Sequence, residues 1–266
     1  MKIITYNVNG IRAVINKGFY QWLEQENPDV ICVQETRAQP EQIDVLKFRE
    51  LGYDSFINSA RTKGYSGTAI FTKVQPLSVE RNFGNAFDGS LFIDQYGDVL
   101  SEGRIIALEF PDFFLITIYV PNAKNDLSRL MLRYEVLDRK LLEYIARLEA
   151  RKPVLLCGDF NVAHRALDLA RPRENERSAG FTQEERESFE NYMTHGMVDI
   201  FRHFYPETVK YTWWSMRLRA RERNVGWRID YFICSKKMID KVKRTEILDE
   251  IAMSDHCPVL VELTMG

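Results

Sequence analysis

Short apolar runs recur along the whole chain and constrain its fold more than any other feature. They lie at 2–7, 29–34, 53–57, 68–72, 104–110, 113–120, 153–158, 228–234 and 258–263. Several contain no polar residue, as at 154–157, and such runs are typical of strands that are covered on both faces. The chain is therefore expected to build sheets that lie between other layers.

Helical patterns lie between these runs. The longest is predicted over 128–149, where apolar residues recur every three or four positions, and a shorter one over 12–26 is stopped by Asn27-Pro28. Another begins at Thr182, since Glu185 follows it at capping-box spacing. Pro111-Asp112 alone separates two strands, which predicts an antiparallel hairpin, and 84–102 is predicted as a surface loop. A mixed-sheet α/β sandwich forming one domain over 1–266 is the expected architecture.

Charge and cysteine usage limit the possible roles. The formal net charge is −2, so a surface for nucleic acid has to be a local basic patch. Cys32, Cys157, Cys234 and Cys257 are widely spaced within or beside apolar runs, which predicts buried free thiols. No leader peptide or membrane-length apolar stretch is found, so a soluble, cytoplasmic protein is expected.

Polar side chains gather where the predicted strands end or begin. They are Asn7, Asn9, Glu35, Tyr119, Asn122, Asp159, Asn161, Asp230, Asp255 and His256. In a mixed sheet these positions could meet at one end of the sandwich. Oxygen ligands without sulfur suit Mg²⁺ or Mn²⁺, and with one imidazole they suit phosphoester cleavage. Taken singly, each of these residues is more often a turn former, a helix cap or a solvated strand end than a functional group.

The motifs in their order resemble the exonuclease III family of abasic-site endonucleases, from Asn7 to His256. The matching segments are Tyr6-Asn7-Val8-Asn9-Gly10, Val33-Gln34-Glu35-Thr36, Lys63-Gly64-Tyr65-Ser66-Gly67, Glu102-Gly103-Arg104, Tyr119-Val120-Pro121-Asn122, Gly158-Asp159-Phe160-Asn161, Ala179-Gly180-Phe181-Thr182, Gly226-Trp227-Arg228-Ile229-Asp230 and Ser254-Asp255-His256. The resemblance implies a four-layered α/β sandwich in which two mixed β-sheets pack face to face and helices flank them. It also implies hydrolysis of the phosphodiester 5′ to an abasic site, which leaves a 3′-hydroxyl, with 3′→5′ exonuclease and 3′-end-trimming activity.

The resemblance also assigns roles at the site. Glu35 resembles the main Mg²⁺ ligand, with Asn7 and Asp255 in support, and Mn²⁺ is expected to substitute. Asp159 resembles the group that deprotonates the attacking water, although which carboxylate holds the metal and which activates water stays open. Asn161 resembles the donor to the transition state, and Tyr119 and Asn122 resemble contacts to the phosphate. His256 resembles a donor to a phosphoryl oxygen, and Asp230 is expected to orient its imidazole. Asn161 and His256 are also expected near the metal.

Substrate recognition has a separate signal. Trp213, Trp227 and Ile229 match positions that line a small pocket for a flipped-out abasic sugar. Five arginines near the tryptophans are expected to form the basic patch: Arg217, Arg219, Arg221, Arg223 and Arg228. Further candidate phosphate contacts are Arg12, Arg37, Tyr65 and Arg104.

The chain departs from some relatives at Asn9, at Asn125 and at Trp213, which stands where some carry Phe. Asn9 stands where some carry Asp, and Asn125, beside Lys124, stands near the place where some insert a basic side chain. The expected partner is duplex DNA with abasic sites or blocked 3′ ends, bound by a monomer that works with other base-excision-repair proteins. Two alternatives are a lipid or inositol-phosphate phosphatase of the same fold, which the tryptophan pocket disfavours, and a non-catalytic DNA-binding module, which the intact polar cluster disfavours.

Overall fold

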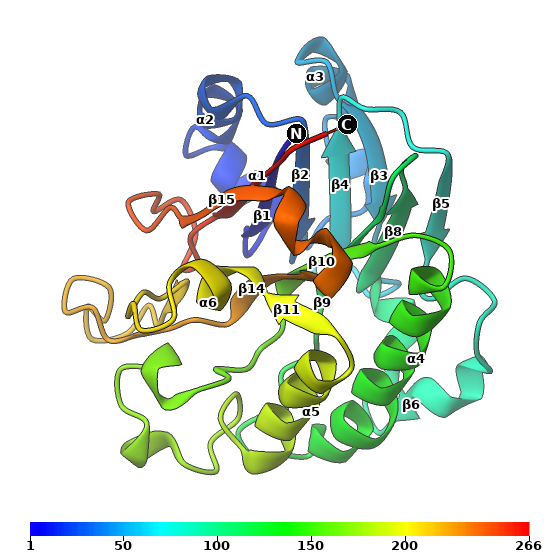
Figure 1. Cartoon of the computed structure of the whole chain (residues 1–266). Coiled ribbons are helices and arrows are strands. Elements are labelled where there is room, and N and C mark those ends of the chain that lie inside the picture. Colours follow the sequence, from blue (N-terminus) through cyan, green and yellow to red (C-terminus); the bar gives the residue numbers. More distant parts are fainter. Residues whose placement is uncertain (266) are drawn as a thin grey trace.

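The computed structural model describes residues 1–265 and contains two six-stranded mixed sheets (Figure 1). Sheet A has the order β15 (Val242–Ile247), β16 (Val259–Leu263), β1 (Lys2–Asn7), β2 (Val30–Gln34), β4 (Thr68–Thr72) and β3 (Asp54–Asn58). Sheet B has the order β11 (Met197–Asp199), β14 (Asp230–Ser235), β10 (Val154–Asp159), β9 (Phe114–Tyr119), β8 (Ile105–Glu109) and β5 (Ser78–Arg81). Each sheet contains one parallel pair, β1 with β2 in sheet A and β9 with β10 in sheet B, and these pairs bring the ends of neighbouring strands together.

The alternation of side chains along the strands explains why the two sheets face each other. In β10, Leu155 and Cys157 belong to the core between the sheets, whereas Val154 and Leu156 pack on the opposite face beneath helices. Both faces of such a strand are covered, which is why the run contains no polar residue. Complete burial of one leucine side chain stabilises a fold by about 1.5–3 kcal/mol. Because β10 is apolar on both faces, the fold gains this free energy only when another layer packs on each face.

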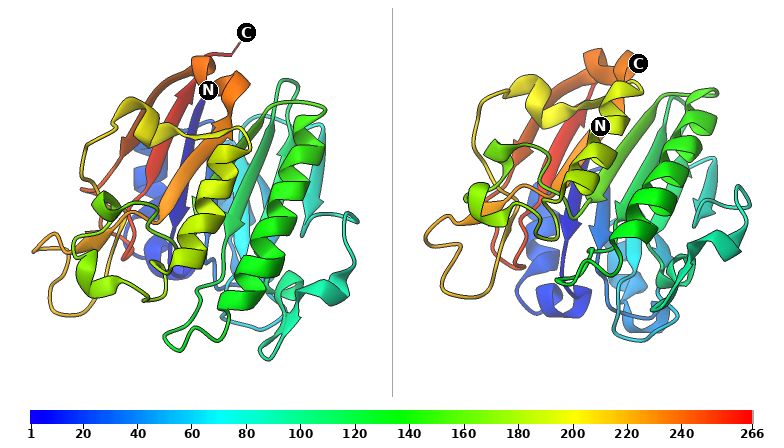
Figure 2. Two further views of the ribbon diagram at one scale, coloured as in Figure 1. Left: turned by 60° about the horizontal axis from the view of Figure 1, so that its bottom comes forward. Right: turned by 90° about the horizontal axis from the view of Figure 1, so that it is seen from below.

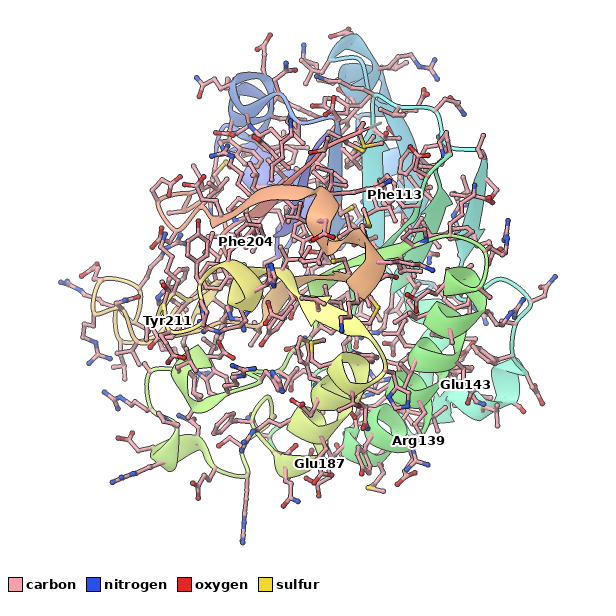
Figure 3. The ribbon with its side chains drawn as sticks, in the orientation of Figure 1. Phe113, Arg139, Glu143, Glu187, Phe204 and Tyr211 are labelled. Carbon is pink, nitrogen blue, oxygen red and sulfur yellow. The ribbon has the colours of Figure 1, made fainter. Side chains whose placement is uncertain are left out.

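Helices form the two outer layers. The outer face of sheet A packs against α1 (Ile11–Ile15), α2 (Phe19–Glu26) and α3 (Val45–Glu50), and that of sheet B against α4 (Asp138–Glu149) and α5 (Gln183–Thr194). Figure 2 shows α4 and α5 lying side by side along sheet B. Arg139, Glu143 and Glu187 on their outer surfaces are exposed to solvent, whereas Phe113 is buried between the sheets (Figure 3). The expected four-layered sandwich is therefore confirmed.

The helix predictions need two corrections. The pattern over 12–26 forms two helices because Gly18, at φ +95°, takes a left-handed conformation and restarts the chain at Phe19. The pattern over 128–149 begins with a π-helix, η4 (Leu132–Leu137), and only then becomes α4. The helix that starts at Thr182 is confirmed as α5, with both halves of its capping box formed.

The segment 84–102 is also more ordered than the predicted surface loop. It contains the short helices η2 (Gly89–Phe92) and η3 (Val99–Glu102), joined by a hairpin of β6 (Ile93–Asp94) and β7 (Gly97–Asp98). Phe92 and Val99 are buried in the core beneath η4 and α4. The polar composition of the segment hides these two apolar anchors, which fasten it to sheet B.

The remaining elements are short. They are α6 (Ile200–Phe204), the hairpin β12 (Trp213–Trp214) and β13 (Gly226–Trp227), and the single turns η1 (Pro40–Gln42), η5 (Ala166–Asp168), η6 (Arg173–Asn175) and η7 (Lys236–Lys241). The predicted hairpin is confirmed as β8–β9, and all four cysteines are buried and free. Among residues 1–265, no helix has the length and apolarity that crossing a membrane requires.

Candidate active site

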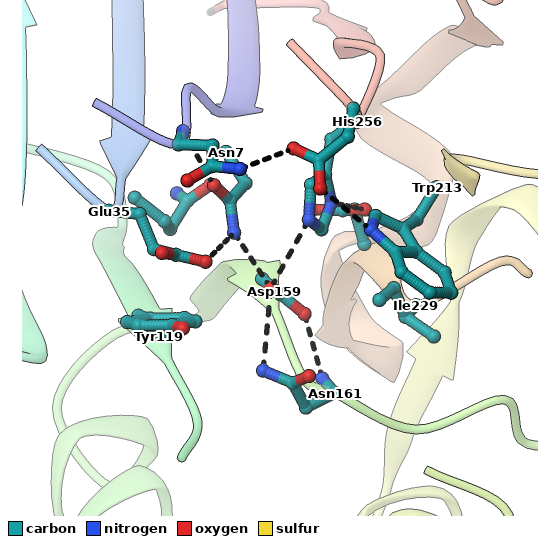
Figure 4. Close-up of polar contacts among 12 residues, drawn as sticks. Asn7, Glu35, Tyr119, Asp159, Asn161, Trp213, Ile229 and His256 are labelled. Atoms are coloured by element: carbon teal, nitrogen blue, oxygen red, sulfur yellow. Dashed lines mark hydrogen bonds and ion pairs between the residues drawn. The ribbon is translucent and has the colours of Figure 1, made fainter. Parts of the chain in front are cut away.

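The candidate site lies at one end of the sandwich, where strands of both sheets end (Figure 4). Sheet A contributes Asn7, the last residue of β1, and Glu35, which directly follows β2. Since β1 and β2 are parallel neighbours, both side chains emerge at the same edge. Asn7 is completely buried and Glu35 is 8% exposed.

Sheet B contributes three side chains from adjacent strands. Tyr119 and Asp159 end the parallel strands β9 and β10, and Asp230 begins the antiparallel strand β14 directly opposite Asp159. The close approach of β9 and β10 requires a glycine, because a Cβ on Gly158 would lie 1.9 Å from the carbonyl oxygen of Ile118. This contact holds Asp159 at the edge of the sheet.

One amide joins the two halves of the site. The side-chain nitrogen of Asn7 donates to Glu35 Oε1 at 3.1 Å and to Asp159 Oδ2 at 2.8 Å. Its oxygen accepts from the backbone N–H of Asn9. Asn7 therefore holds carboxylates from different sheets close together, a geometry that is otherwise opposed by their mutual repulsion.

A histidine–carboxylate pair completes the group. His256 lies before β16, and its Nδ1 is 2.8 Å from Asp230 Oδ2, while its Nε2 lies 3.9 Å from Asp159 Oδ2. Burial by itself lowers the pKa of His256, but the carboxylates of Asp230 and Asp159 outweigh it and raise the pKa to about 10. The imidazole is thus a cation at neutral pH, with Nε2 facing the centre of the site. The expected orientation of His256 by Asp230 is present.

The buried carboxylates form a suitable place for a cation. One ligand atom each from Glu35, Asp159 and His256 lies within 4.8 Å of the others. Burial, followed by repulsion from Asp230, raises the pKa of Asp159 to about 7. Hard oxygen donors with uncompensated negative charge fit a hard divalent cation. The sequence pattern indicated this cation site, and the structure brings its acidic members together.

Asp255 lies outside this group of three. Its carboxylate accepts from Asn9 Nδ2 at 2.9 Å and from Trp213 Nε1 at 3.0 Å. Burial works against its ionisation, but His256 and the two hydrogen bonds lower the pKa of Asp255. In this arrangement Asp255 fixes a wall of the site and faces Trp213.

Arg133, a residue that the sequence did not single out, supports the turn after β10. Asn161, at φ +48°, donates its backbone N–H to Asp159 Oδ1 at 2.8 Å. Arg133, buried in η4, donates to the carbonyl oxygens of Phe160 at 2.5 Å and Asn161 at 2.9 Å. Arg133 lies in the middle of an amphipathic helical pattern, where an arginine is usually solvated, so the sequence carries no signal for this contact.

An apolar wall adjoins the polar group. Trp213 and Trp227 pair across the β12–β13 hairpin, with ring centroids 6.4 Å apart in an edge-to-face arrangement. Gly180 closes the other side, since a Cβ there would lie 3.2 Å from the Trp227 ring. The cavity has a volume of about 340 Å³, and its lining includes Asn9, Glu35, Arg37, Tyr119, Asn122, Asn125, Asp159, Asn161, Ala179, Gly180, Trp213, Trp227, Ile229, Asp255 and His256. The predicted pocket and the predicted polar cluster are therefore parts of one cavity.

The candidate phosphate contacts occupy different environments. Arg37 is partly exposed beside the cavity and pairs with Glu35 Oε2 at 2.6 Å, and Arg12 is an exposed residue of α1. Tyr65 is 38% exposed, and Arg104 beneath it is 3% exposed. The Arg104 guanidinium donates to Glu102 and to the Tyr119 carbonyl oxygen, so it supports the floor of the site from inside the protein.

The expected patch of five arginines is wrong for two of its members. Arg228 is buried between the carboxylates of Asp168 and Asp199, at 2.8 and 2.7 Å. Arg221 stacks on Trp214 and donates to three backbone carbonyl oxygens, which anchors the loop. The exposed basic surface of this loop is carried by Arg217, Arg219 and Arg223. Alternation of arginines along the sequence did not distinguish the anchors from the exposed side chains.

Comparison with known proteins gives concordant matches. The model of the endonuclease/exonuclease/phosphatase family matches residues 4–256. An exodeoxyribonuclease of Bacillus subtilis is 43% identical over 97% of this chain and 98% of its own. A DNA-(apurinic or apyrimidinic site) endonuclease of Dictyostelium discoideum is 41% identical over 100% of this chain and 71% of its own. The solved AP endonuclease of Leishmania major has a TM-score of 0.85 at 32% identity, covering 100% of this chain and 88% of its own.

Proposed function

The chain belongs to the endonuclease/exonuclease/phosphatase family, and from this premise we propose that it is a DNA-repair nuclease that hydrolyses the phosphodiester 5′ to an abasic site. The product is a 3′-hydroxyl end. The same site trims blocked 3′ ends and acts as a 3′→5′ exonuclease on duplex DNA. We also propose that residues 1–266 act as one catalytic domain.

One observation supports this proposal: the polar group around Asp159 and the tryptophan wall line a single cavity. The polar side of the cavity offers carboxylates, amides and a protonated imidazole, which suit phosphodiester hydrolysis. The apolar side, with Trp213 and Trp227, suits a sugar that lacks its base. A phosphate-cleaving site beside a small apolar pocket favours an abasic nucleotide over a lipid or inositol headgroup.

Mg²⁺ is the proposed metal, with Mn²⁺ as a substitute, and Glu35 and Asp159 would hold it. Asn7, Asn161, Asp255 and His256 would complete its surroundings. When bound, the cation supplies charge neutralisation at the phosphoryl oxygens. The fit rests on the negative charge of the buried carboxylates of Glu35 and Asp159. Among residues 1–265, Arg37 pairs with Glu35, and no arginine or lysine pairs with Asp159.

The protein's own groups perform the remaining steps. Asp159, whose carboxylate lies among the ligand atoms at the centre of the site, accepts the proton of the attacking water. His256 donates from Nε2 to a phosphoryl oxygen, while Asp230 holds the ring by Nδ1. Asn161 donates to the charge that develops on phosphorus-bound oxygen, and Tyr119 and Asn122 contact the phosphate.

Binding of the duplex extends over the rim of the cavity. Trp213, Trp227 and Ile229 contact the abasic sugar on the apolar side of the cavity. Arg217 and the neighbouring exposed arginines contact the phosphate backbone on one side of the lesion. Arg12, Arg37 and Tyr65 contact it on the other side, with Arg104 supporting Tyr65 through a hydrogen bond of 3.2 Å.

The test uses a duplex that carries one tetrahydrofuran abasic analogue. We expect incision on the 5′ side of the analogue in Mg²⁺, and none with a chelator or in Asp159→Asn, which retains the shape of the side chain but cannot accept the proton. Asp54→Asn is the matched control, because Asp54 is exposed at the end of β3 that lies away from the site. A folded wild-type protein that leaves this duplex intact would refute the proposal.

A further inference from the structure

The β6–β7 hairpin places an aromatic ring against the loop that follows β9, and this loop contributes Asn122 and Asn125 to the lining of the cavity. Tyr96 lies in the hairpin turn and is 47% exposed. Its hydroxyl shares a hydrogen bond of 2.6 Å with Ser128 Oγ, and its backbone N–H donates to Asp94 Oδ1. The ring is therefore fixed against the loop that follows β9, although the two segments are distant in the sequence.

Two cations stack on this ring, and they differ in their other contacts. Arg129 Cζ lies 5.4 Å from the ring centroid, and Arg129 is buried and paired with Asp94 and Glu102. Lys124 Nζ lies 4.8 Å from the same centroid. Within residues 1–265, no carboxylate pairs with Lys124. Tyr96 thus holds one cation whose charge is neutralised and one whose charge is available.

Lys124 lies directly beside the lining of the cavity. Its neighbours Asn122 and Asn125 both line it. Lys124 has a left-handed conformation at φ +72°, and its backbone N–H donates to Asn122 Oδ1 at 2.8 Å. This turn and the Tyr96 ring fix the ammonium group at the rim, so the long side chain has lost part of its freedom before any ligand arrives.

The acidic residue closest to Lys124 in the chain is Asp126, whose pKa is lowered by its hydrogen bonds to Ser128 and, less, by Lys124; within residues 1–265 the two form no ion pair. Asp94 and Glu102 are paired with arginines, and Asp88 and Asp98 accept hydrogen bonds from the backbone of their own turns. An ordered cation with no ion-pair partner in the described part of the chain, at the mouth of a site that acts on phosphodiesters, has a polyanion as its natural ligand.

We propose that Lys124 binds a backbone phosphate of the duplex at this rim, and that Tyr96 is a positioning residue that holds the ammonium group in place. This inference rests on the proposed function, since it assumes duplex DNA as the substrate. The β6–β7 hairpin then serves as a brace for the binding surface, built from the segment that Phe92 and Val99 fasten to sheet B.

Binding is measured by fluorescence anisotropy on the tetrahydrofuran duplex in chelator, over a range of KCl concentrations. We expect Lys124→Ala to raise Kd by about fivefold at low salt and to reduce the slope of log Kd against log salt by about one. Tyr96→Ala should give part of this loss, and Tyr96→Phe, which keeps the ring, should stay within about twofold of wild type. In the double variant, removal of Tyr96 should add nothing to the loss from Lys124→Ala.

Lys73→Ala is the matched control. Lys73 stacks on Tyr53 at the same 4.8 Å, but it follows β4 at the end of sheet A that lies away from the site. An unchanged salt slope in Lys124→Ala would overturn the phosphate contact, and additive losses in the double variant would overturn the positioning role. Incision by the wild-type protein is tested in parallel in Mg²⁺, and its absence would instead overturn the proposed function.

Discussion

Replacement of Asp230 by asparagine tests whether the charge of His256 takes part in catalysis. Asparagine keeps the size of the side chain and can still accept from Nδ1, which lies 2.8 Å from Asp230 Oδ2. It removes the negative charge that opposes the effect of burial on His256. Without that charge the imidazolium is less stable, so His256 loses its proton at a lower pH.

The size of the effect follows from the contact. An opposite charge in direct contact shifts a pKa by roughly 1–3 units, and each unit corresponds to about 1.4 kcal/mol. The pKa of His256 should therefore fall from about 10 to roughly 7–9. The basic limb of the kcat/KM profile should move down by the same amount, while activity near pH 6.5, the ordinary pKa of histidine, should change much less.

The assay measures initial incision rates on the tetrahydrofuran duplex from about pH 6 to about pH 10.5, the window in which this histidine should titrate. Asp54→Asn serves again as the control, and its profile should match that of wild type. A basic limb at the same pH in Asp230→Asn and wild type would refute the reasoning. A uniform loss at every pH would show that Asp230 only positions the ring and that the charge is not required.

Three further predictions concern stability, selectivity and metal binding. Arg228→Met leaves the buried carboxylate of Asp199 without a charged partner, while Asp168 keeps Arg202. The free energy of unfolding in urea should therefore fall by about 3–5 kcal/mol, against less than about 1 kcal/mol for Arg244→Met on the exposed side of β15, and equal losses would contradict this. Trp227→Ala should weaken binding of the abasic duplex more than that of undamaged duplex, and equal weakening would remove Trp227 from the pocket. Mg²⁺ should raise the Tm of wild type more than that of Asp159→Asn, because the cation relieves repulsion among buried carboxylates, and identical shifts would place the metal elsewhere.

The sequence predicted those parts of the fold that repeat a simple period. The uninterrupted apolar run of β10 and the capping box at the start of α5 are local signals, and both elements appear where they were expected. Short strands such as β5 and β11 carry little periodicity, because few residues lie on each face. The segment 84–102 depends on Phe92 and Val99, whose burial is decided by distant partners in η4 and α4.

The candidate site was predictable to a similar extent. Asp159 and His256 lie at strand ends, where a mixed sheet collects polar groups, and so the pattern indicated their meeting. Arg133 and Arg228 show the limit of this reasoning, because both are buried arginines with charged or carbonyl partners from other parts of the chain. The sequence distinguishes a buried arginine from an exposed one only when its partners are known.

The hydrogen bond between Asn7 and Asp159 also has a consequence for the stage of folding at which the site forms. Asn7, Glu35 and His256 lie at the ends of strands of sheet A, whereas Tyr119, Asp159 and Asp230 lie at the ends of strands of sheet B. A polypeptide whose synthesis has not yet reached His256 carries some of these groups but lacks the rest of the site. Hydrolysis therefore requires both sheets to be formed and packed, because neither sheet alone carries the whole site.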